Sequence, residues 1–335
     1  MCDNSPLIEK ISMDKFPIRQ PPSTEPYEND EYFDFKYGAC IKCGSLQAMT
    51  LVSQDILYKE FHNGTTLSDT WYRHHSEFTD FIKVDSSDKI IEIGGTGTLK
   101  LPYSHVILNI TESEGCIKGN CEDFDFSAYN VVVMSHVFEH LYEPVKFIRN
   151  CKAPHIFISQ PVMVSSNVIP LNAEHTFFAD DIDVQAVFER NNYRLKDIKY
   201  FEKHSIFFHF VYDETVIPRT DNERPGREEL LIDNFNRRKN GIESFIIDND
   251  YTYVMPSGHY GQYVYYYMDK TRLPRGFIDN DVNKIGKRNY GTPLFTYSPN
   301  KVTPKTIILH GGHYHREIKE QILNIYPDVN VIEYA

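Results

Sequence analysis

Three short stretches of this sequence combine residue types and spacings that could do chemistry. They are the glycine-rich turn in KIIEIGGTGT (89–98), the pair Cys40 and Cys43, and the adjacent Glu174 and His175. Glycines after a strand let the backbone approach a nucleotide closely, and two thiolates at this spacing can share a metal ion. A histidine oriented by a carboxylate can move protons near neutral pH. Each signal is weak alone, so its meaning depends on the surrounding elements.

The glycine turn opens a predicted α/β region from residue 81 to 213. Strands are expected at 89–93, 105–110, 129–141 and 155–162, a short strand within 117–126, helices at 142–151 and 181–191, and an antiparallel pair over 196–213. Short connections without hairpin turns favour a parallel sheet, whose ligands bind at the carboxyl ends of the strands.

The cysteine pair belongs to a predicted N-terminal unit, residues 1–80, with a zinc knuckle followed by helical chain. A structural zinc site needs four ligands, and Cys2 is the clearest third one. The N-terminal amine or a histidine (His62, His74 or His75) could supply the fourth. The alternative is a turn with two cysteines that bind no metal.

A polar, proline-bearing linker and an amphipathic helix are expected over 214–241. Leu230, Leu231 and Phe235 are predicted to share the apolar face of this helix, with Gly241 ending it.

Residues 242–335 repeat the pattern of strand, glycine turn and helix, which predicts a C-terminal Rossmann-like domain. His310, His313 and His315 surround a Gly-Gly pair after an apolar strand. They are interpreted as loop residues that line the crevice of this domain, and a metal site is the less favoured alternative.

Composition limits the class of partner. The 335 residues carry a formal charge of −12, which argues against nucleic acid or an anionic membrane as the main partner. No apolar run approaches the roughly 20 residues of a membrane span. Six cysteines, all within the first 151 positions, favour reduced thiols over a disulfide framework. A cytoplasmic location is expected because no signal peptide is visible.

Four pieces, taken in order, resemble the S-adenosylmethionine-dependent C-methyltransferases that act on nucleotide-linked deoxysugars. The pieces are GACIKCGSLQ, IIEIGGTGTL, NAEHTFF followed by FEKHS, and FIDNDVNKIGKRNYGTPL. The resemblance implies a zinc-binding N-terminal domain, a class I methyltransferase domain and a C-terminal Rossmann-like domain. It also implies a role in carbohydrate biosynthesis, with a nucleotide-sugar as substrate and S-adenosylmethionine and zinc as cofactors. Oligomers are possible.

The resemblance also implies site residues. The methionine and ribose end of the cofactor pocket would be shaped by Glu92, Gly94, Gly95 and Gly97. The positions that contact ribose and adenine fall on Asn109, Asn120 and Cys121, and Ser135, His136 and Val137 would form the floor. Glu139 and His140 would orient the loop that follows.

For catalysis, the family's acid–histidine pair corresponds to Glu174 and His175. Methyl transfer to carbon needs a base that removes the proton next to a carbonyl, and His175 is the candidate. His204 corresponds to a second active-site histidine.

The cofactor region departs from the family pattern. Pro102 interrupts the segment where a helix is usual, and amides at Asn109 and Asn120 replace carboxylates. The main alternative is therefore a protein of this fold that has lost cofactor binding and acts as a carbohydrate- or nucleotide-binding or assembly component. Methylation of oxygen or nitrogen in another small molecule is a further alternative, and another enzyme class, such as a nicotinamide-dependent one, remains.

Overall fold

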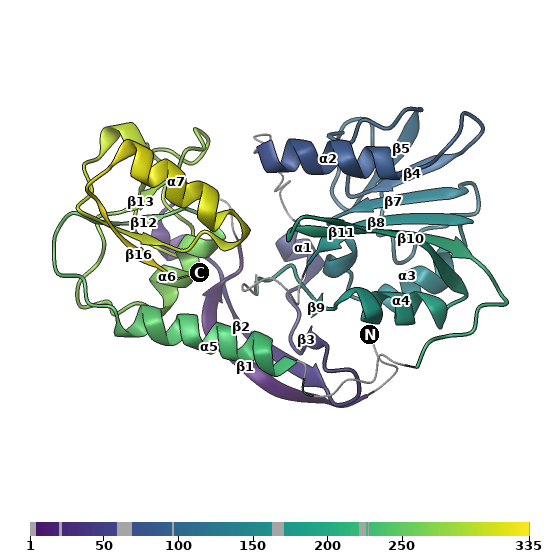
Figure 1. Cartoon of the computed structure of the whole chain (residues 1–335), viewed down its shortest axis with the longest axis horizontal. Coiled ribbons are helices and arrows are strands. Elements are labelled where there is room, and N and C mark those ends of the chain that lie inside the picture. Colours follow the sequence, from purple (N-terminus) through teal and green to yellow (C-terminus); the bar gives the residue numbers. More distant parts are fainter. Residues whose placement is uncertain are drawn as a thin grey trace. The chain divides into compact units, whose positions relative to one another are not determined.

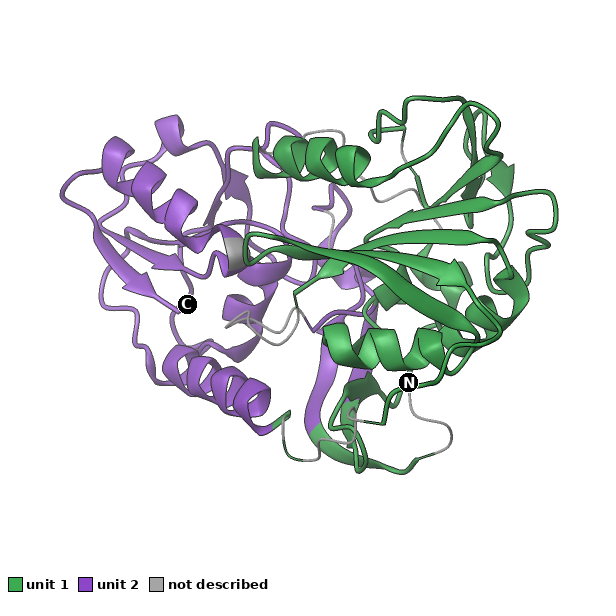
Figure 2. Ribbon diagram, turned by 45° about the vertical axis from the view of Figure 1, so that its right-hand side comes forward, with its two compact units in different colours: residues 1–10, 37–166, 174–228 green, residues 11–36, 167–173, 229–335 purple. Residues whose placement is uncertain are grey.

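The computed structural model describes residues 5–19, 22–58, 69–95, 97–162, 171–220, 226 and 228–334. The chain divides into two compact units (Figure 2). Unit 1 comprises residues 1–10, 37–166 and 174–228, and unit 2 comprises 11–36, 167–173 and 229–335. The four-part division drawn from the sequence remains a prediction about the chain.

Unit 1 contains a seven-stranded sheet (Figure 1). Its strands are β4 (Ile90–Ile93), β5 (His105–Asn109), β6 (Ile117–Lys118), β7 (Val131–Ser135), β8 (His155–Pro161), β10 (Tyr193–Phe201) and β11 (Ser205–Tyr212). The spatial order is β10-β11-β8-β7-β4-β5-β6. The five strands from β4 to β8 are parallel, and β11 runs antiparallel to both β8 and β10. The predicted α/β fold with a terminal antiparallel pair is confirmed.

Both faces of this sheet carry buried apolar side chains, because successive residues of its strands point to opposite faces. In β7, Val132 and Met134 belong to one apolar cluster, whereas Val131 and Val133 belong to another. Because successive side chains of a strand point to opposite faces, β7 is in contact with an apolar cluster on each face and is therefore apolar throughout.

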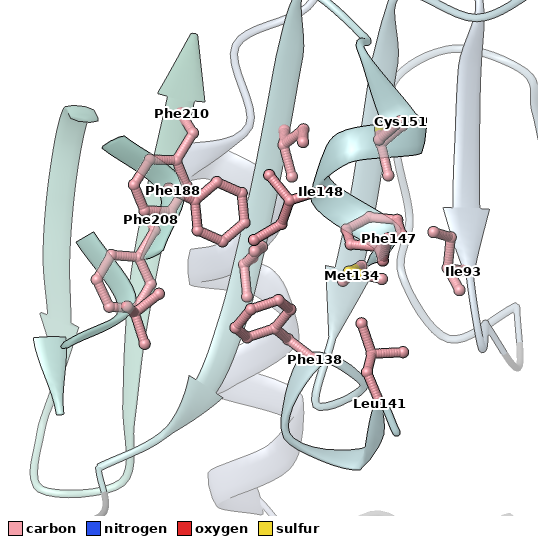
Figure 3. Close-up of a cluster of buried hydrophobic side chains, with 14 of the residues drawn as sticks. Ile93, Met134, Phe138, Leu141, Phe147, Ile148, Cys151, Phe188, Phe208 and Phe210 are labelled. Carbon is pink, nitrogen blue, oxygen red and sulfur yellow. The ribbon is translucent and has the colours of Figure 1, made fainter. Parts of the chain in front are cut away.

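The first cluster includes side chains of α3 (Pro144–Cys151) and α4 (Asp181–Glu189), and the second includes Phe78 and Phe81 of α2 (Asp69–Phe81). Figure 3 shows Phe147 and Ile148 of α3 beside Phe188 of α4 and Phe208 of β11. Helices thus pack against both faces of the sheet.

The strand order reverses between β4 and β7. The connections after β4 and β7 therefore leave the sheet in opposite directions at one edge, which is where open α/β sheets bind ligands. None of the described residues between β4 and β5 or between β5 and β6 is helical. The interruption expected from Pro102 between β4 and β5 is confirmed.

A separate four-stranded sheet has the order β1-β2-β3-β9. Its strands are β1 (Leu7–Pro17), β2 (Tyr32–Cys40), β3 (Leu46–Ala48) and β9 (Phe177–Phe178), with the short helix η1 (Tyr27–Asn29) before β2 and α1 (Gln54–Leu57) after β3. Strands β2 and β3 form an antiparallel hairpin around the cysteine pair.

Unit 2 contains five parallel strands in the order β14-β13-β12-β15-β16. They are β12 (Thr252–Met255), β13 (Phe277–Ile278), β14 (Thr296–Tyr297), β15 (Thr306–Leu309) and β16 (Asn330–Glu333), with α6 (His259–Tyr267), η3 (Pro299–Lys301), η4 (Gly312–Tyr314) and α7 (His315–Ile325). The order reverses between β12 and β15, as in doubly wound folds. The predicted C-terminal Rossmann-like domain is confirmed.

The sequence piece over 277–294 has a structural role within unit 2. Arg288 makes a buried, two-bonded ion pair with Asp30, with Nη1–Oδ2 and Nη2–Oδ1 distances of 2.6 and 2.8 Å. Asn289 Oδ1 accepts a hydrogen bond of 2.9 Å from the Gly258 N–H at the start of α6. These contacts fix residues 22–31 and the turn after β12 to the loop that follows β13.

The predicted end of the amphipathic helix at Gly241 is wrong, because α5 runs from Glu228 to Ser244. Leu231 and Phe235 are buried as expected, but Leu230 is exposed, since it lies about 100° around the helix from Leu231. A Cβ at Gly241 would lie 2.9 Å from Tyr334 Cε1. This glycine therefore permits close packing inside the helix and does not end it.

Within the part of the chain that the structure describes, no helix is both long and apolar enough to cross a membrane.

Candidate functional site

The glycine turn lies where the strand order of unit 1 reverses. Gly94 has φ +69°, and its N–H donates a hydrogen bond of 2.8 Å to the Leu108 carbonyl. A Cβ at Gly94 would lie 2.6 Å from Cγ2 of Val137, which follows β7. Gly97 has φ +73° and open space where a Cβ would be. At Gly94 the backbone of the turn therefore lies in close contact with the residues that follow β7.

Glu92 lies directly beneath this turn and is almost fully buried. A Cβ at Gly95 would collide with its carboxylate. His105 Nε2, at the start of β5, is 2.9 Å from Glu92 Oε2. This hydrogen bond raises the pKa of His105. This partner was not predicted from the sequence, because His105 is identified only by its position on the neighbouring strand.

The predicted ribose and adenine residues have different surroundings. Asn109 is buried and donates from Nδ2 to the Gly95 carbonyl at 3.1 Å and to Ser113 Oγ at 3.2 Å. Asn120 donates to Gln54 Oε1 at 3.1 Å. Cys121 packs in the apolar core, and burial raises the pKa of its thiol to about 12. Asn109 thus binds the glycine turn itself.

A cavity of about 560 Å³ lies beside the loops that follow β5 and β6. Its lining residues are Gln54, Asp55, Tyr58, Ile110, Thr111, Glu112, Lys118 and Asn120. The volume is in the range of small-molecule sites. Asn120 is therefore a predicted site residue that faces a cavity, and Asp55 and Glu112 supply acidic groups that sequence analysis missed.

Three histidines converge at the same edge of the sheet. One ring nitrogen from each of His74, His136 and His204 lies within 4.8 Å of the other two. His74 comes from α2, His136 follows β7 with φ +53°, and His204 precedes β11. Because β11 is antiparallel to its neighbours, its first residue lies at the carboxyl end of β8. His74 was considered as a zinc-knuckle ligand from sequence, but the structure places it in this group.

A second group contains Glu139, His140 and His175, again with ligand atoms within 4.8 Å of one another. Glu139 is 1% exposed, and neither carboxyl oxygen accepts a hydrogen bond from a described residue. Burial raises the pKa of Glu139 to about 7 and lowers that of His140. Glu174 Oε2 is 3.6 Å from His140 Nδ1.

The two groups are joined, because His136 Nδ1 is 3.4 Å from Glu139 Oε1. The predicted catalytic residues His175 and His204 therefore lie at opposite ends of one row of titratable side chains. The Thr176 N–H donates to the Glu139 carbonyl at 3.0 Å, which attaches the loop of Glu174 and His175 to η2 (Phe138–His140). Neither His74 nor Trp71, whose ring centroid is 4.8 Å from that of His136, was predicted from the sequence as a member of this site.

The cysteine knuckle has half of a structural zinc ligand set among the described residues. Cys40 and Cys43 are buried at the turn of the hairpin, and Cys43 Sγ is 3.1 Å from Ser45 Oγ. Cys2 and His62 lie outside the described residues. Neither group of three candidate ligands found among the described residues includes Cys40 or Cys43. Two thiols alone do not make the four-ligand site of zinc, and zinc binding here remains a prediction.

In unit 2, His310 is buried after β15, and His315 Nε2 is 2.9 Å from Glu333 Oε2. The side chain of His313 is not among those described. The two groups of candidate metal ligands found among the described residues include neither His310 nor His315.

Neither a protein-family model nor a curated protein matches this sequence. Among solved structures, it is similar to an S-adenosylmethionine-dependent methyltransferase from Aquifex aeolicus. The two are 12% identical, the match covers 43% of this chain and 89% of the other, and the TM-score is 0.33. It is also similar to such a methyltransferase from Mesorhizobium loti, at 7% identity, 41% and 96% coverage, and a TM-score of 0.33. At these identities the similarity concerns fold alone.

We predict that His105→Gln changes how stability depends on pH. The pKa of His105 is raised in the folded state, so its stabilising contribution is complete below about pH 6.5 and is lost as pH rises through the raised pKa. As pH rises through this range, the free energy of unfolding of wild type should fall more than that of the variant. At pH 6 the variant should be less stable by about 1–3 kcal/mol, the usual contribution of a hydrogen bond to a charged group. Urea unfolding at a series of pH values measures both.

His155→Gln is the matched control. His155 pairs with His209 at 3.1 Å, not with a carboxylate, and burial lowers its pKa. Because this variant retains the hydrogen bond between His105 and Glu92, its stability should fall above pH 6.5 as that of wild type does. Parallel pH profiles for wild type and His105→Gln would contradict the prediction.

Proposed function

We propose that unit 1 is an S-adenosylmethionine-dependent methyltransferase, and that it methylates a carbon atom of a nucleotide-linked ketosugar. The observation that carries the proposal is the arrangement at one edge of the sheet. A glycine turn with a buried carboxylate beneath it lies at the reversal of strand order, and a row of histidines and carboxylates follows the neighbouring strands.

The residues present suit this cofactor in chemistry. When bound, it supplies a methyl group activated by a positive sulfonium, next to a positively charged amino group. Glu92, Gly94, Gly95 and Gly97 would hold the methionine end, where backbone can approach and the buried carboxylate attracts positive charge. Asn120 and the cavity of about 560 Å³ would hold the nucleoside.

His175 would remove the proton from the carbon next to the substrate carbonyl, leaving the electron pair as an enolate. Its ring is buried, with its centroid 5.0 Å from that of His140. Glu174, 3.6 Å from His140, would stabilise positive charge that develops on the two rings. His204 lies at the other end of the row and would contact the substrate.

A second candidate is a protein of this fold that binds a carbohydrate or nucleotide, or takes part in an assembly, without the cofactor. One observation favours it: the amide of Asn109 donates to the Gly95 carbonyl and Ser113. A carboxylate at this position would accept hydrogen bonds from ribose hydroxyls, and charge-assisted bonds are the stronger ones.

Calorimetry with S-adenosylhomocysteine distinguishes these candidates. Wild type should bind it with a Kd in the micromolar range, and Gly94→Ala should weaken binding at least tenfold. The new Cβ would lie 2.6 Å from Val137 Cγ2, at a φ that L-residues adopt at a cost of about 1–2 kcal/mol. Gly286→Ala is the control, because φ +76° gives the same strain with nothing within 4 Å. An absence of wild-type binding at millimolar ligand would reject the methyltransferase.

The base is tested by His175→Ala. Turnover on a panel of nucleotide-linked ketosugars should fall by about 10²–10⁴, the usual contribution of general-base catalysis, with unchanged affinity for S-adenosylhomocysteine. His155→Gln, at the amino end of β8, should retain full turnover. Wild-type rates in His175→Ala would exclude it as the base.

A further inference from the structure

The three-histidine group has the spacing of ligands around a single metal ion. The ring centroids of His74, His136 and His204 are separated by 5.1, 5.5 and 5.6 Å. Imidazole nitrogens bind zinc at about 2.0–2.1 Å, which places each ring centroid about 3.2 Å from the metal and tetrahedral neighbours about 5.2 Å apart. The observed spacing agrees with this value.

Hydrogen bonds orient these rings as metal ligands are usually oriented. His74 Nε2 is 2.8 Å from Ser159 Oγ, and His204 Nδ1 is 2.5 Å from Ser205 Oγ. A metal-binding histidine typically donates its other N–H to such a partner, which fixes the tautomer of the ring. His136 Nε2 is 2.9 Å from the same Ser205 Oγ. The opposite nitrogens, Nδ1 of His74 and His136 and Nε2 of His204, are then the ones that can bind a cation.

A buried polar atom at this site lacks a partner. His74 is fully buried, and its Nδ1 has no hydrogen-bond partner among the described residues. Buried polar atoms are nearly always paired. Glu139 Oε1 is 3.4 Å from His136 Nδ1, and neither oxygen of this carboxyl group accepts a hydrogen bond from a described residue. In its ionised form this group would offset the charge of a bound cation.

We propose that His74, His136 and His204 bind a divalent transition-metal cation of the kind that imidazole ligands prefer, such as zinc or cobalt. The site is distinct from the cysteine knuckle and does not rest on methyl transfer. With three protein ligands it leaves a coordination position open, as catalytic metal sites do.

Trp71 provides a direct test. It is the only tryptophan in the chain, and its ring centroid is 5.0 Å from His74, 4.8 Å from His136 and 4.9 Å from His204. Paramagnetic cobalt at this site should quench its fluorescence. Full-length protein treated with a chelator should lose at least half of its tryptophan emission on addition of one equivalent of Co²⁺, and Zn²⁺ should reverse the loss.

His136→Gln and His204→Gln should each raise the Co²⁺ concentration needed for half-maximal quenching at least tenfold. Circular dichroism verifies that both variants are folded. His75→Gln is the matched control, because its centroid is 5.4 Å from Trp71 but it is outside the group. Quenching that persists in both variants, or no quenching of wild type at millimolar Co²⁺, would overturn the proposal. Binding of S-adenosylhomocysteine to the metal-free protein is measured separately, so either proposal can fail alone.

Unit 2 contains an independent feature, a buried arginine without an acidic partner. Arg238 of α5 is 9% exposed. Among the described residues, no carboxylate forms an ion pair with it and its buried Nε has no hydrogen-bond partner. An isolated buried charge is costly, so such groups are normally paired. A ligand that supplies the missing negative charge would remove this cost.

The arginine lines a cavity of about 20 Å³ with Phe235, Lys239, Ile242, Tyr260, Tyr263, Tyr267 and His310. The hydroxyl of Tyr267 and Nδ1 of His310 are also buried, and neither has a hydrogen-bond partner in the described part of the chain. Burial and the charge of Arg238 lower the pKa of His310 to about 3, so this ring is neutral. No carboxylate is among the lining residues, and the space suits one small group.

We infer that this cavity binds an oxyanion, the carboxylate or phosphate group at the end of a small molecule. Phosphate and acetate, added separately to the full-length protein in thermal unfolding, distinguish the two sources. One of them should raise Tm of wild type and of Arg237→Gln, the exposed neighbour on α5, but not of Arg238→Gln.

Without added anion, Arg238→Gln should unfold at a higher Tm than wild type, because an unpaired buried charge is removed. An arginine with a purely structural role would give the opposite result. A lower Tm of Arg238→Gln, or equal stabilisation of all three proteins by both anions, would overturn the inference.

Discussion

The site in unit 1 depends on how closely the chain segments after β4 and β7 approach each other. A side chain at Gly94 would overlap Val137, and one at Gly95 would overlap the Glu92 carboxylate. Backbone alone can therefore form this edge of the sheet. Because β4 and β7 are adjacent and parallel, Glu92 and His136 are held at the same edge by the strand pairing itself.

Burial then determines the charge of the groups collected there. Desolvation lowers the pKa of His74 and His140 and raises that of Glu139. Neutral imidazole is the form that accepts a proton or binds a metal ion. The sheet thus supplies both the positions of these side chains and buried surroundings that favour their uncharged forms.

Unit 2 applies the same topology to different chemistry. His310 follows β15 and Tyr260 lies in the helix after β12, the two strands between which the order reverses. Here the unmatched group is a cation, Arg238, in an aromatic cavity without carboxylates. In both units the site lies where the strand order reverses. The side chains around each site determine which ligand it could bind.

The sequence alone determined local elements: the parallel strands of the seven-stranded sheet, its terminal antiparallel pair, and the missing helix after β4. Apolar alternation, glycines and Pro102 act within a few residues, so they can be read directly. The tertiary structure decided which histidines meet, because His74, His136 and His204 come from a helix and two strand ends that only the strand order brings together. It also decided that Leu230 is exposed and that Gly241 lies within α5, since both depend on packing against distant residues such as Tyr334.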